Sequence, residues 1–332
     1  MKITKPDYFD RFHCLAGSCP DSCCQEWEVQ VDADSAAAYR ALPGILGDCL
    51  RHCLRDEDGE TYLTIADRRC PMWRADGLCR IQAELGEAAL CKTCRAFPRL
   101  THDYGDFVEL GLELSCPEAA RLILNEPAVL VTDELPGSGE AEYDAEAMTV
   151  LKASREQALE LLRNTDRAIG ETLALLLLYG CQAQGELDGE EAVPFDGEAA
   201  LETARELSQP GDAAEILPFF QSLEILTDKW KTRLLSPAPG DWDSRTLALT
   251  RYFVNRYWLQ AVSDYDLYSR VKFMVIACLL LRKLGGDFEK PAQLFSKEIE
   301  NDADNMDALL DAAYEHPAFT DARLLGMLLE SP

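Results

Sequence analysis

The sequence contains no long apolar segment and no export signal. Its longest apolar runs, Leu173–Leu178 and Met274–Leu281, fall far short of the roughly 20 residues that a membrane-spanning helix needs. The opening residues, MKITKPDYFDRFHC, lack the apolar core of a secretory signal peptide. We therefore expect a soluble, cytoplasmic protein with no membrane partner.

Basic side chains are scarce. Lys and Arg total 32 against 59 Asp and Glu, a formal net charge of −27 at pH 7. No run of Lys or Arg exceeds two residues, so nothing offsets the repulsion of a phosphate backbone. Residues 1–124 hold 14 basic and 21 acidic side chains, whereas the remainder holds 18 and 38. We expect no nucleic-acid partner, and an acidic second half.

Cysteine, by contrast, is abundant and clustered. Eleven of the 13 cysteines lie between Cys14 and Cys116, and only Cys181 and Cys278 follow. The cytosol keeps thiols reduced, so clustered cysteines there more often bind metal than form disulfides. Disulfides and incidental buried thiols are the alternatives. Cys181 and Cys278 lie in apolar runs, and we predict that both are buried free thiols.

The predicted fold is mainly α and has two domains. Residues 1–124 form a small irregular cysteine-rich metal-binding domain with a few short strands, residues 125–144 a Pro/Gly/Glu-rich linker, and residues 145–332 an all-helical domain. In the first domain we predict strands at Thr61–Ile65 and Phe107–Leu114, and helices at Asp34–Leu42, Ile81–Cys91 and 116–124. Apolar spacing then predicts helices at 145–168, 171–184, 198–208, 213–235, 244–262, 266–284, 290–299 and 304–315.

Four segments carry the cysteines that we expect to bind metal. They are CLAGSCPDSCC from Cys14, CPMWRADGLC from Cys70, CKTCRAFPR from Cys91, and SCPE around Cys116. Thiolates select zinc, copper(I) or iron–sulfur clusters over hard cations. Only Cys91 and Cys94 form a CxxC pair of the kind typical of zinc sites. A Pro directly after Cys70 and Cys116 is frequent in iron–sulfur ligation, so the spacing favours iron–sulfur, with zinc as the alternative.

Taken together, these segments resemble the flagellin lysine-N-methylase (FliB-like) family. The resemblance rests on the CxxxxCxxxCC array with Trp27 behind it, on CPMWRADGLC, on CRAFPR and on SCPEAAR, in this order. It implies methylation of lysine side chains of flagellin by S-adenosyl-L-methionine, assisted by a 4Fe-4S cluster. It also implies metal ligation by the matching cysteines, namely Cys14, Cys19, Cys23, Cys24, Cys70, Cys79, Cys94 and Cys116.

The sequence departs from simple expectations in three ways. Eight thiols exceed the four that one cluster uses, so either some are structural or a second metal site exists. Five cysteines have no place in the family pattern: Cys49, Cys53, Cys91, Cys181 and Cys278. Neither a GxGxxG loop after a strand nor a CxxxCxxC motif is present, since Glu26 stands where the third cysteine would be.

Several residues beside the cysteines have two interpretations. Arg95 and Arg99 could hold the carboxylate of S-adenosylmethionine, or form ordinary salt bridges. Trp27 and Trp73 could face a sulfonium, shield a cluster or pack in a core. For the whole chain, the alternative to a methyltransferase is a non-catalytic zinc- or iron-binding adaptor protein. In either case the helical domain is the predicted substrate- or partner-binding part.

Overall fold

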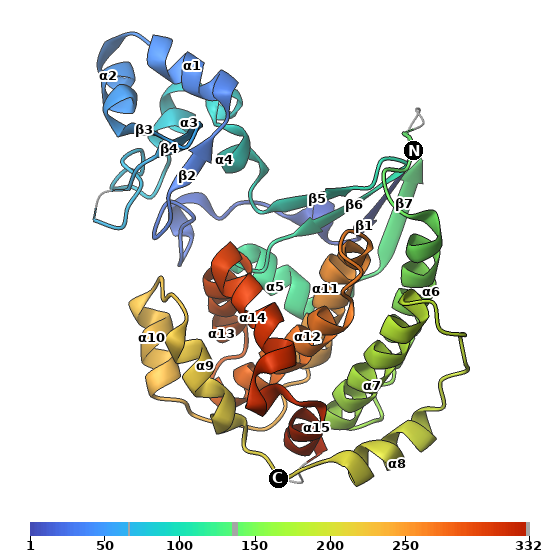
Figure 1. Cartoon of the computed structure of the whole chain (residues 1–332). Coiled ribbons are helices and arrows are strands. Elements are labelled where there is room, and N and C mark those ends of the chain that lie inside the picture. Colours follow the sequence, from blue (N-terminus) through green and yellow to red (C-terminus); the bar gives the residue numbers. More distant parts are fainter. Residues whose placement is uncertain (66, 135–138, 330–332) are drawn as a thin grey trace.

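The computed structural model describes residues 1–65, 67–134 and 139–329, and helices dominate it (Figure 1). A cysteine-rich N-terminal region with two small sheets precedes a part built of helices, as the sequence predicts. Within the described residues, no helix combines the length and apolar character needed to cross a membrane.

A four-stranded sheet links the cysteine-rich region to the helices. In it, β1 (Lys2–Pro6) pairs in parallel with β6 (Phe107–Leu112) and antiparallel with β7 (Leu130–Glu134), and β5 (Arg99–Asp103) closes the other side. The strand β7 lies inside the span 125–144 that we predicted to be a linker. It pairs with β1 from Pro6 opposite Leu130 to Lys2 opposite Glu134, and its β-branched Val131 and Thr132 favour a strand. The domain limits themselves remain a prediction.

Between β1 and β5 the chain forms a separate unit, which we call the cysteine lobe (residues 29–96). Figure 1 shows it in blue and cyan, standing off from the helices. It contains β2 (Val29–Val31), β3 (Leu54–Glu57), β4 (Glu60–Leu63), α1 (Ala33–Ala41), α2 (Gly44–Cys53), α3 (Arg80–Leu85) and α4 (Lys92–Ala96). Its hydrophobic core is distinct from that of the rest of the molecule, and Cys70 and Cys91 belong to it.

Caps and turns explain where the helices of the lobe begin and end. The Asp32 carboxylate accepts hydrogen bonds from two backbone amides, that of Ser35 at the start of α1 and that of Lys92 at the start of α4. The amide of Lys92 holds the pKa of Asp32 at about 2. The helix predicted over Ile81–Cys91 ends early because Gly86, with a φ of +88°, terminates α3.

The remaining helices form the helical body. They are α5 (Pro117–Asn125), α6 (Ala145–Leu161), α7 (Ile169–Leu187), α8 (Gly197–Leu207), α9 (Leu217–Ser222), α10 (Asp228–Leu235), α11 (Thr246–Tyr257), α12 (Tyr268–Leu284), α13 (Glu289–Phe295), α14 (Ala303–Glu315) and α15 (Asp321–Leu329). The apolar spacing of the sequence did not predict α15. It also joined α9 and α10, which separate because the amides of Leu226 and Thr227 donate to the buried Glu298 carboxylate at 2.7 and 2.9 Å.

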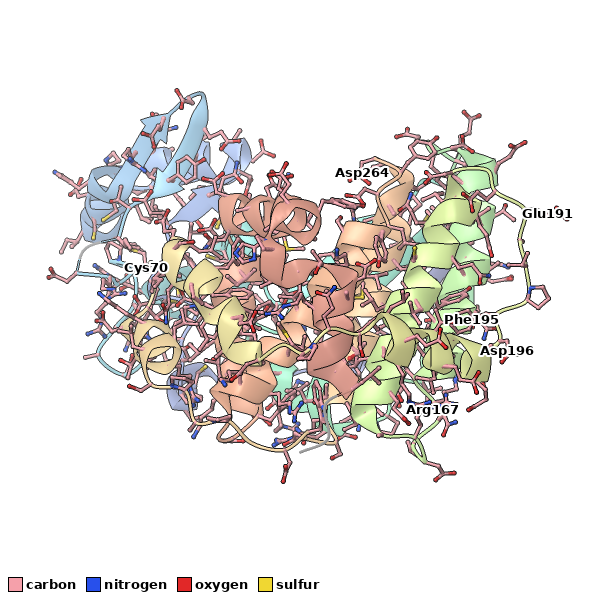
Figure 2. All side chains as sticks on the ribbon, turned by 60° about the horizontal axis from the view of Figure 1, so that its bottom comes forward. Cys70, Arg167, Glu191, Phe195, Asp196 and Asp264 are labelled. Atoms are coloured by element: carbon pink, nitrogen blue, oxygen red, sulfur yellow. The ribbon has the colours of Figure 1, made fainter. Side chains whose placement is uncertain are left out.

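The helix α12 lies at the centre of the body, and Cys278 on it is fully buried, as predicted. The prediction for Cys181 is wrong, because that side chain is exposed. Towards its end, α7 packs through Tyr179, Gly180 and Ala183, which leaves Cys181 on the outer face. Figure 2 shows Cys70 at one end of the molecule and the segment from Glu191 to Asp196 at the opposite end.

Candidate metal and cofactor site

A cavity of about 390 Å³ brings the four cysteine segments together. Its wall comes from the cysteine loop (residues 14–24), from the cysteine lobe, and from the start of α5. All eight cysteines of the family pattern line it: Cys14, Cys19, Cys23, Cys24, Cys70, Cys79, Cys94 and Cys116. Arg95 and Arg99 line the same cavity. The fold therefore collects in one place the side chains that the sequence analysis selected.

Backbone amides two or three residues ahead approach five of the thiols. Cys14 Sγ accepts a hydrogen bond from the backbone amide of Ala16 at 3.4 Å. Backbone amides also form hydrogen bonds to four other thiols: Met72 to Cys70, Ile81 and Gln82 to Cys79, Thr93 and Cys94 to Cys91, and Glu118 and Ala119 to Cys116. Burial nevertheless raises the pKa of Cys70, Cys79 and Cys116, and these hydrogen bonds offset only part of the rise. Cys79, Cys91 and Cys116 also directly precede α3, α4 and α5. Amides and helix starts stabilise a thiolate, the form that binds metal.

Cys91 was not among the predicted ligands, yet it shares this geometry. It is buried in the core of the lobe, with 1% of its surface exposed, and it forms a hydrogen bond with Cys94. The CxxC spacing of Cys91 and Cys94 was the signal available in the sequence. The family pattern overrode that signal because it contains only the second cysteine.

The protonation of the thiols differs along the cavity. Hydrogen bonds with Cys23 and Cys94 lower the pKa of Cys24 and Cys91, respectively, to about 7. Burial raises the pKa of Cys70 to about 12 and that of Cys116 to about 11. Metal binding to the buried thiols must therefore release protons, as it does in thiolate sites generally.

The donor set of the cavity consists of thiols, which suit zinc, copper(I) or an iron–sulfur cluster. Among the described residues, no three Cys, His, Asp or Glu side chains converge as the ligands of one metal ion would. The thiols instead surround the cavity from several sides. A cluster separates its ligand sulfurs more widely than one ion does, because iron and sulfide atoms lie between them. All 13 cysteines are free, so no disulfide competes for these thiols.

The helical body holds the cysteine loop through Asp21. Lys297, whose side chain is 1% exposed, approaches the Asp21 carboxylate at 3.3 Å, and Gln293 donates to it at 3.0 Å. The ammonium of the exposed Lys229 lies 3.7 Å from the same Asp21 carboxylate. The ammonium of Lys297 also lies 4.8 Å from the centre of the Trp27 ring. We call this contact, made by Asp21, Gln293, Lys297 and Trp27, the clasp.

The clasp extends to the residue before Cys116. Gln293 also donates to the carbonyl of Ser115 at 2.6 Å, and Asn301 donates to the Ser115 hydroxyl at 3.0 Å. Lys297 belongs to a π-helical turn, Ser296–Glu300, that follows α13. Such turns occur often at functional sites, and here one aims a buried cation at the cysteine loop. Two of the four cysteine segments are thus positioned by residues of the helical body.

Other predicted residues take specific positions on or near the wall. The Arg95 guanidinium donates to the Ala88 carbonyl at 3.5 Å, and that of Arg99 lies 5.1 Å from the Phe12 ring centre. Neither arginine forms an ion pair with another described residue. The ring of Trp73, like that of Trp27, already faces a cation of the protein, the guanidinium of Arg69 at 4.0 Å.

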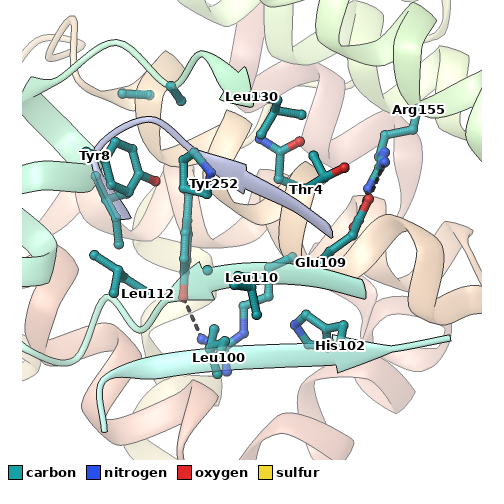
Figure 3. Close-up of a pocket in the computed structure, with 17 residues that line it drawn as sticks. Thr4, Tyr8, Leu100, His102, Glu109, Leu110, Leu112, Leu130, Arg155 and Tyr252 are labelled. Carbon is teal, nitrogen blue, oxygen red and sulfur yellow. Dashed lines mark hydrogen bonds and ion pairs between the residues drawn. The ribbon is translucent and has the colours of Figure 1, made fainter. Parts of the chain in front are cut away.

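A second, smaller cavity of about 60 Å³ lies between the four-stranded sheet and the helical body (Figure 3). Two hydrogen bonds join Glu109 of β6 to Arg155 of α6 at 2.7 and 2.8 Å. Tyr252 lies beside the cavity, and its hydroxyl oxygen accepts a hydrogen bond from the Arg256 guanidinium. Ligand sites usually measure about 300–1,000 Å³, so this space suits ordered water and attaches the sheet to the body.

Comparisons with known proteins identify relatives over part of the chain. The chain is 34% identical over 141 residues to the lysine-N-methylases of Salmonella typhimurium and Salmonella choleraesuis, which covers 40% of this chain and 35% of each relative. The chain thus spans about a third of the length of those two relatives. It is equally similar to the flagellar biosynthetic protein FliU of Salmonella muenchen, of which 83% is covered.

No family model matches the chain, and no solved structure does. The similarity to FliU nevertheless extends over most of that relative, and the similarity to the two lysine-N-methylases has the same extent on this chain. The chain belongs to the flagellin lysine-N-methylase (FliB/FliU) family.

Proposed function

We propose that this protein methylates lysine side chains of flagellin, with S-adenosyl-L-methionine as methyl donor and an iron–sulfur centre in the cysteine cavity. The proposed metal ligands come from the eight cysteines that line the cavity: Cys14, Cys19, Cys23, Cys24, Cys70, Cys79, Cys94 and Cys116. The observation that carries the proposal is their convergence with Arg95 and Arg99 on one cavity, in a chain related to lysine-N-methylases.

The cavity has the size and side chains for a small cofactor beside the metal. Its volume of about 390 Å³ lies within the range of ligand sites, about 300–1,000 Å³. Arg95 and Arg99 are exposed and unpaired with carboxylates among the described residues, so they are available to bind the cofactor carboxylate. Trp27 and Trp73 are not proposed to bind the sulfonium, because a protein cation already faces each ring.

Methyl transfer requires a neutral lysine amine. The amine forms a bond to the methyl carbon as the bond from that carbon to the sulfonium sulfur breaks, which leaves S-adenosylhomocysteine and a methylated lysine. Removing the proton from a lysine with a pKa of about 10.4 costs about 4.6 kcal/mol at pH 7. A nearby sulfonium and a desolvated site both lower that pKa.

The proton must go to a group near the cavity. Two of its carboxylates are already engaged: Glu118 accepts two hydrogen bonds from Arg121, at 2.7 and 2.9 Å, and Asp21 belongs to the clasp. His13 and Glu87 also line the cavity and are exposed. We propose one of these two as the proton acceptor, and His13→Gln and Glu87→Gln test which one limits turnover at pH 7.

The acidic helical body is the proposed docking part for flagellin. Residues beyond 124 hold 18 basic and 38 acidic side chains, and this charge attracts lysine-bearing segments of a partner. Exposed charges are screened by salt, so binding of flagellin should weaken as ionic strength rises. We place the reaction in the cytoplasm, where free thiols such as these persist.

The direct test is mass spectrometry of flagellin after incubation with the anaerobically purified protein and S-adenosylmethionine. We expect lysine residues that gain the mass of one or more methyl groups. Arg95→Ala with Arg99→Ala should raise the KM for S-adenosylmethionine about 10–100-fold, the cost of losing one or two charge-assisted contacts. Arg74→Ala is the matched control, because Arg74 is an exposed arginine of the lobe that pairs with Asp76 instead.

A second candidate function is a non-catalytic metal-binding adaptor. It is favoured by the extent of the match, which covers only 35% of each lysine-N-methylase. Metal-loaded protein that binds flagellin without adding methyl groups would support the adaptor and refute the enzyme.

A further inference from the structure

The strand β5 forms an outer edge of the four-stranded sheet. It pairs with β6 on one side, and the order β5-β6-β1-β7 leaves its other side without a neighbouring strand among the described residues (Figure 1). The backbone amides and carbonyls of such an edge can pair with an extended segment of another chain. Which of these groups are available depends on how β5 is bonded to β6.

Hydrogen bonds at the two ends of β5 fix which of its backbone groups face β6. At one end the carbonyl of Pro98 accepts from the amide of Glu113 at 2.7 Å, and at the other the amide of Tyr104 donates to the carbonyl of Phe107 at 3.0 Å. In an antiparallel pair, residues that bond to the partner strand alternate with residues whose groups point the other way. The even-numbered residues of β5 therefore bond to β6, and the odd-numbered residues face away.

The backbone groups of three residues thus point to the open edge. They are Arg99, Thr101 and Asp103, whose side chains are exposed as well. Beyond the strand pairs, no hydrogen bond to their amides or carbonyls occurs within the part of the chain that the structure describes. Each of these residues offers one donor and one acceptor to an added strand.

The open edge leads directly to the cysteine cavity. Arg99, the first residue of β5, lines that cavity, and so do Phe97 and Pro98 before it. A strand rises about 3.3 Å per residue, so Asp103 at the far end of β5 lies about 13 Å from Arg99. A segment paired with β5 therefore reaches the cavity at one end, where a lysine can extend its side chain into it.

The far end of the edge is acidic. Asp103 ends β5, and the turn that follows carries Asp106. The segment with Glu140 and Glu142 lies against this turn, through the Glu140 carbonyl and a hydrogen bond of 2.8 Å from the Tyr143 hydroxyl to the Asp106 carboxylate. All four carboxylates are on exposed residues, and none forms an ion pair with another described residue. Their charge complements a segment that carries basic residues besides its target lysine.

We propose that the open edge of β5 is the docking site for the substrate, and that a lysine-bearing segment of flagellin adds to it as a fifth strand of the sheet. This inference rests on the proposed function. The acidic helical body attracts the partner from a distance, whereas the edge aligns one extended segment with the cavity. The target lysine then lies at the Arg99 end, and a second basic residue about four positions away lies at the Asp103 end.

The first test measures amide hydrogen exchange in the full-length wild-type protein, with and without flagellin, resolved to single residues by mass spectrometry. In the complex we expect the amides of Arg99, Thr101 and Asp103 to exchange about tenfold more slowly, because the added strand accepts hydrogen bonds from them.

The opposite edge of the sheet is the internal control. On β7 the Val129 carbonyl accepts from the Asp7 amide, so the even-numbered residues of β7 face outward. No residue of β7 is among those that line the cysteine cavity. The outward amides of Thr132 and Glu134 should therefore exchange at the same rate with and without flagellin.

Thr101→Pro and Thr132→Pro are a matched pair of variants. Each places Pro at an outward-facing position of an edge strand, where the missing N–H removes no bond of the sheet. Thr101→Pro should raise the Kd for flagellin, measured by calorimetry, about tenfold, because it removes one donor and its ring obstructs the added strand. Thr132→Pro should leave that Kd unchanged, and both variants should bind S-adenosylmethionine as the wild type does.

Three results would overturn the inference. Bound flagellin that leaves the three amides of β5 unprotected would place the docking site elsewhere, and so would equal effects of the two Pro variants. Protection of β5 that rises with the concentration of the protein alone would assign the edge to a second copy of the chain.

These measurements need no turnover, so they separate this inference from the proposed activity. Flagellin that protects β5 without being methylated would leave the docking site standing and refute the methyltransferase. Methylation with β5 unprotected would refute only the docking site, and flagellin that neither binds nor gains methyl groups would refute both.

Discussion

The cysteine lobe and the helical body are stabilised in different ways. The body packs large side chains such as Trp230, Trp258, Phe253 and Phe273 in its interior, each of them almost fully buried. Among the described residues of the lobe, twelve buried side chains form its core, and two of these are cysteines. The core of a unit this small supplies only about 3–5 kcal/mol, so a bound metal would add substantially to its stability, and the cysteines here are all free. If the proposed metal site is correct, we expect the body to fold by burial alone and the lobe to depend on metal.

Metal removal is the strongest test of this difference. Under anaerobic chelation we expect the lobe to lose its structure, because its small core cannot offset the entropy of folding. The helical body should persist, since its core contains none of the proposed ligands except Cys116. Limited proteolysis followed by mass spectrometry should find new cleavage sites within residues 29–96 and few beyond residue 145. Uniform cleavage, or none, would show that the two parts are stabilised alike.

The clasp between the two parts is the next largest expected effect. Asp21→Ala removes the carboxylate that faces the buried Lys297, and breaking a buried ion pair on one side costs about 3–5 kcal/mol. We expect the free energy of unfolding, measured in urea, to fall by about 3 kcal/mol, because Trp27 still faces the ammonium.

Lys229→Ala is the matched control for the clasp. Lys229 faces the same carboxylate at 3.7 Å, but its side chain is 66% exposed. Its loss should change the free energy of unfolding by less than about 1 kcal/mol. Equal effects of Asp21→Ala and Lys229→Ala would mean that the buried lysine does not join the parts.

The cysteines outside the cavity provide a smaller effect. A variant with Cys49, Cys53, Cys181 and Cys278 all replaced by Ala should keep the full metal content, because none of the four lines the cavity. It should lose about 1–2 kcal/mol of stability, mainly from Cys278, which is fully buried against Thr250. Loss of iron from this variant would place at least one of the four in the ligand set.

The smallest expected effect is on the pH dependence of the free energy of unfolding, through His102 at the junction between the four-stranded sheet and the helical body. Burial lowers the pKa of His102, on β5, below its ordinary value of about 6.5. The folded state therefore favours neutral His102, and its contribution is fully present above pH 6.5 and declines as the pH falls further. His102→Gln should reduce the loss of stability between pH 7 and 5, by at most about 1.4 kcal/mol per pH unit. An unchanged pH dependence of urea unfolding in this variant would refute that role.

The sequence revealed those features that depend on local spacing. Helical periodicity predicted most of the body, and four short motifs selected eight cysteines that line one cavity. The strand β7 escaped prediction because Pro and Gly residues surround a short β-branched segment, and its partner β1 lies more than a hundred residues away. The separation of α9 from α10 depends on Glu298, some seventy residues further along the chain.

The parts of the site that could not be predicted depend on contacts over long sequence distances. Lys297 meets Asp21 across 276 residues, and nothing in the local sequence around Lys297 indicates that contact. The same is true of Gln293 and Ser115. Cys91 shows a different limit, because its CxxC signal was present and the family pattern took precedence over it.

The parallel pairing of β1 with β6 fixes the order in which parts of this protein can fold during synthesis on the ribosome. Lys2 lies opposite Phe107, and ribosomes add about 5–20 residues per second, so β1 waits on the order of ten seconds for its partner. Residues 29–96 emerge during that interval, before the strand that anchors them to the body exists. Lys297 emerges later still, and only then can it hold Asp21. The cysteine loop of a nascent chain therefore lacks its partner in the helical body until the 276 residues that separate Asp21 from Lys297 have been added.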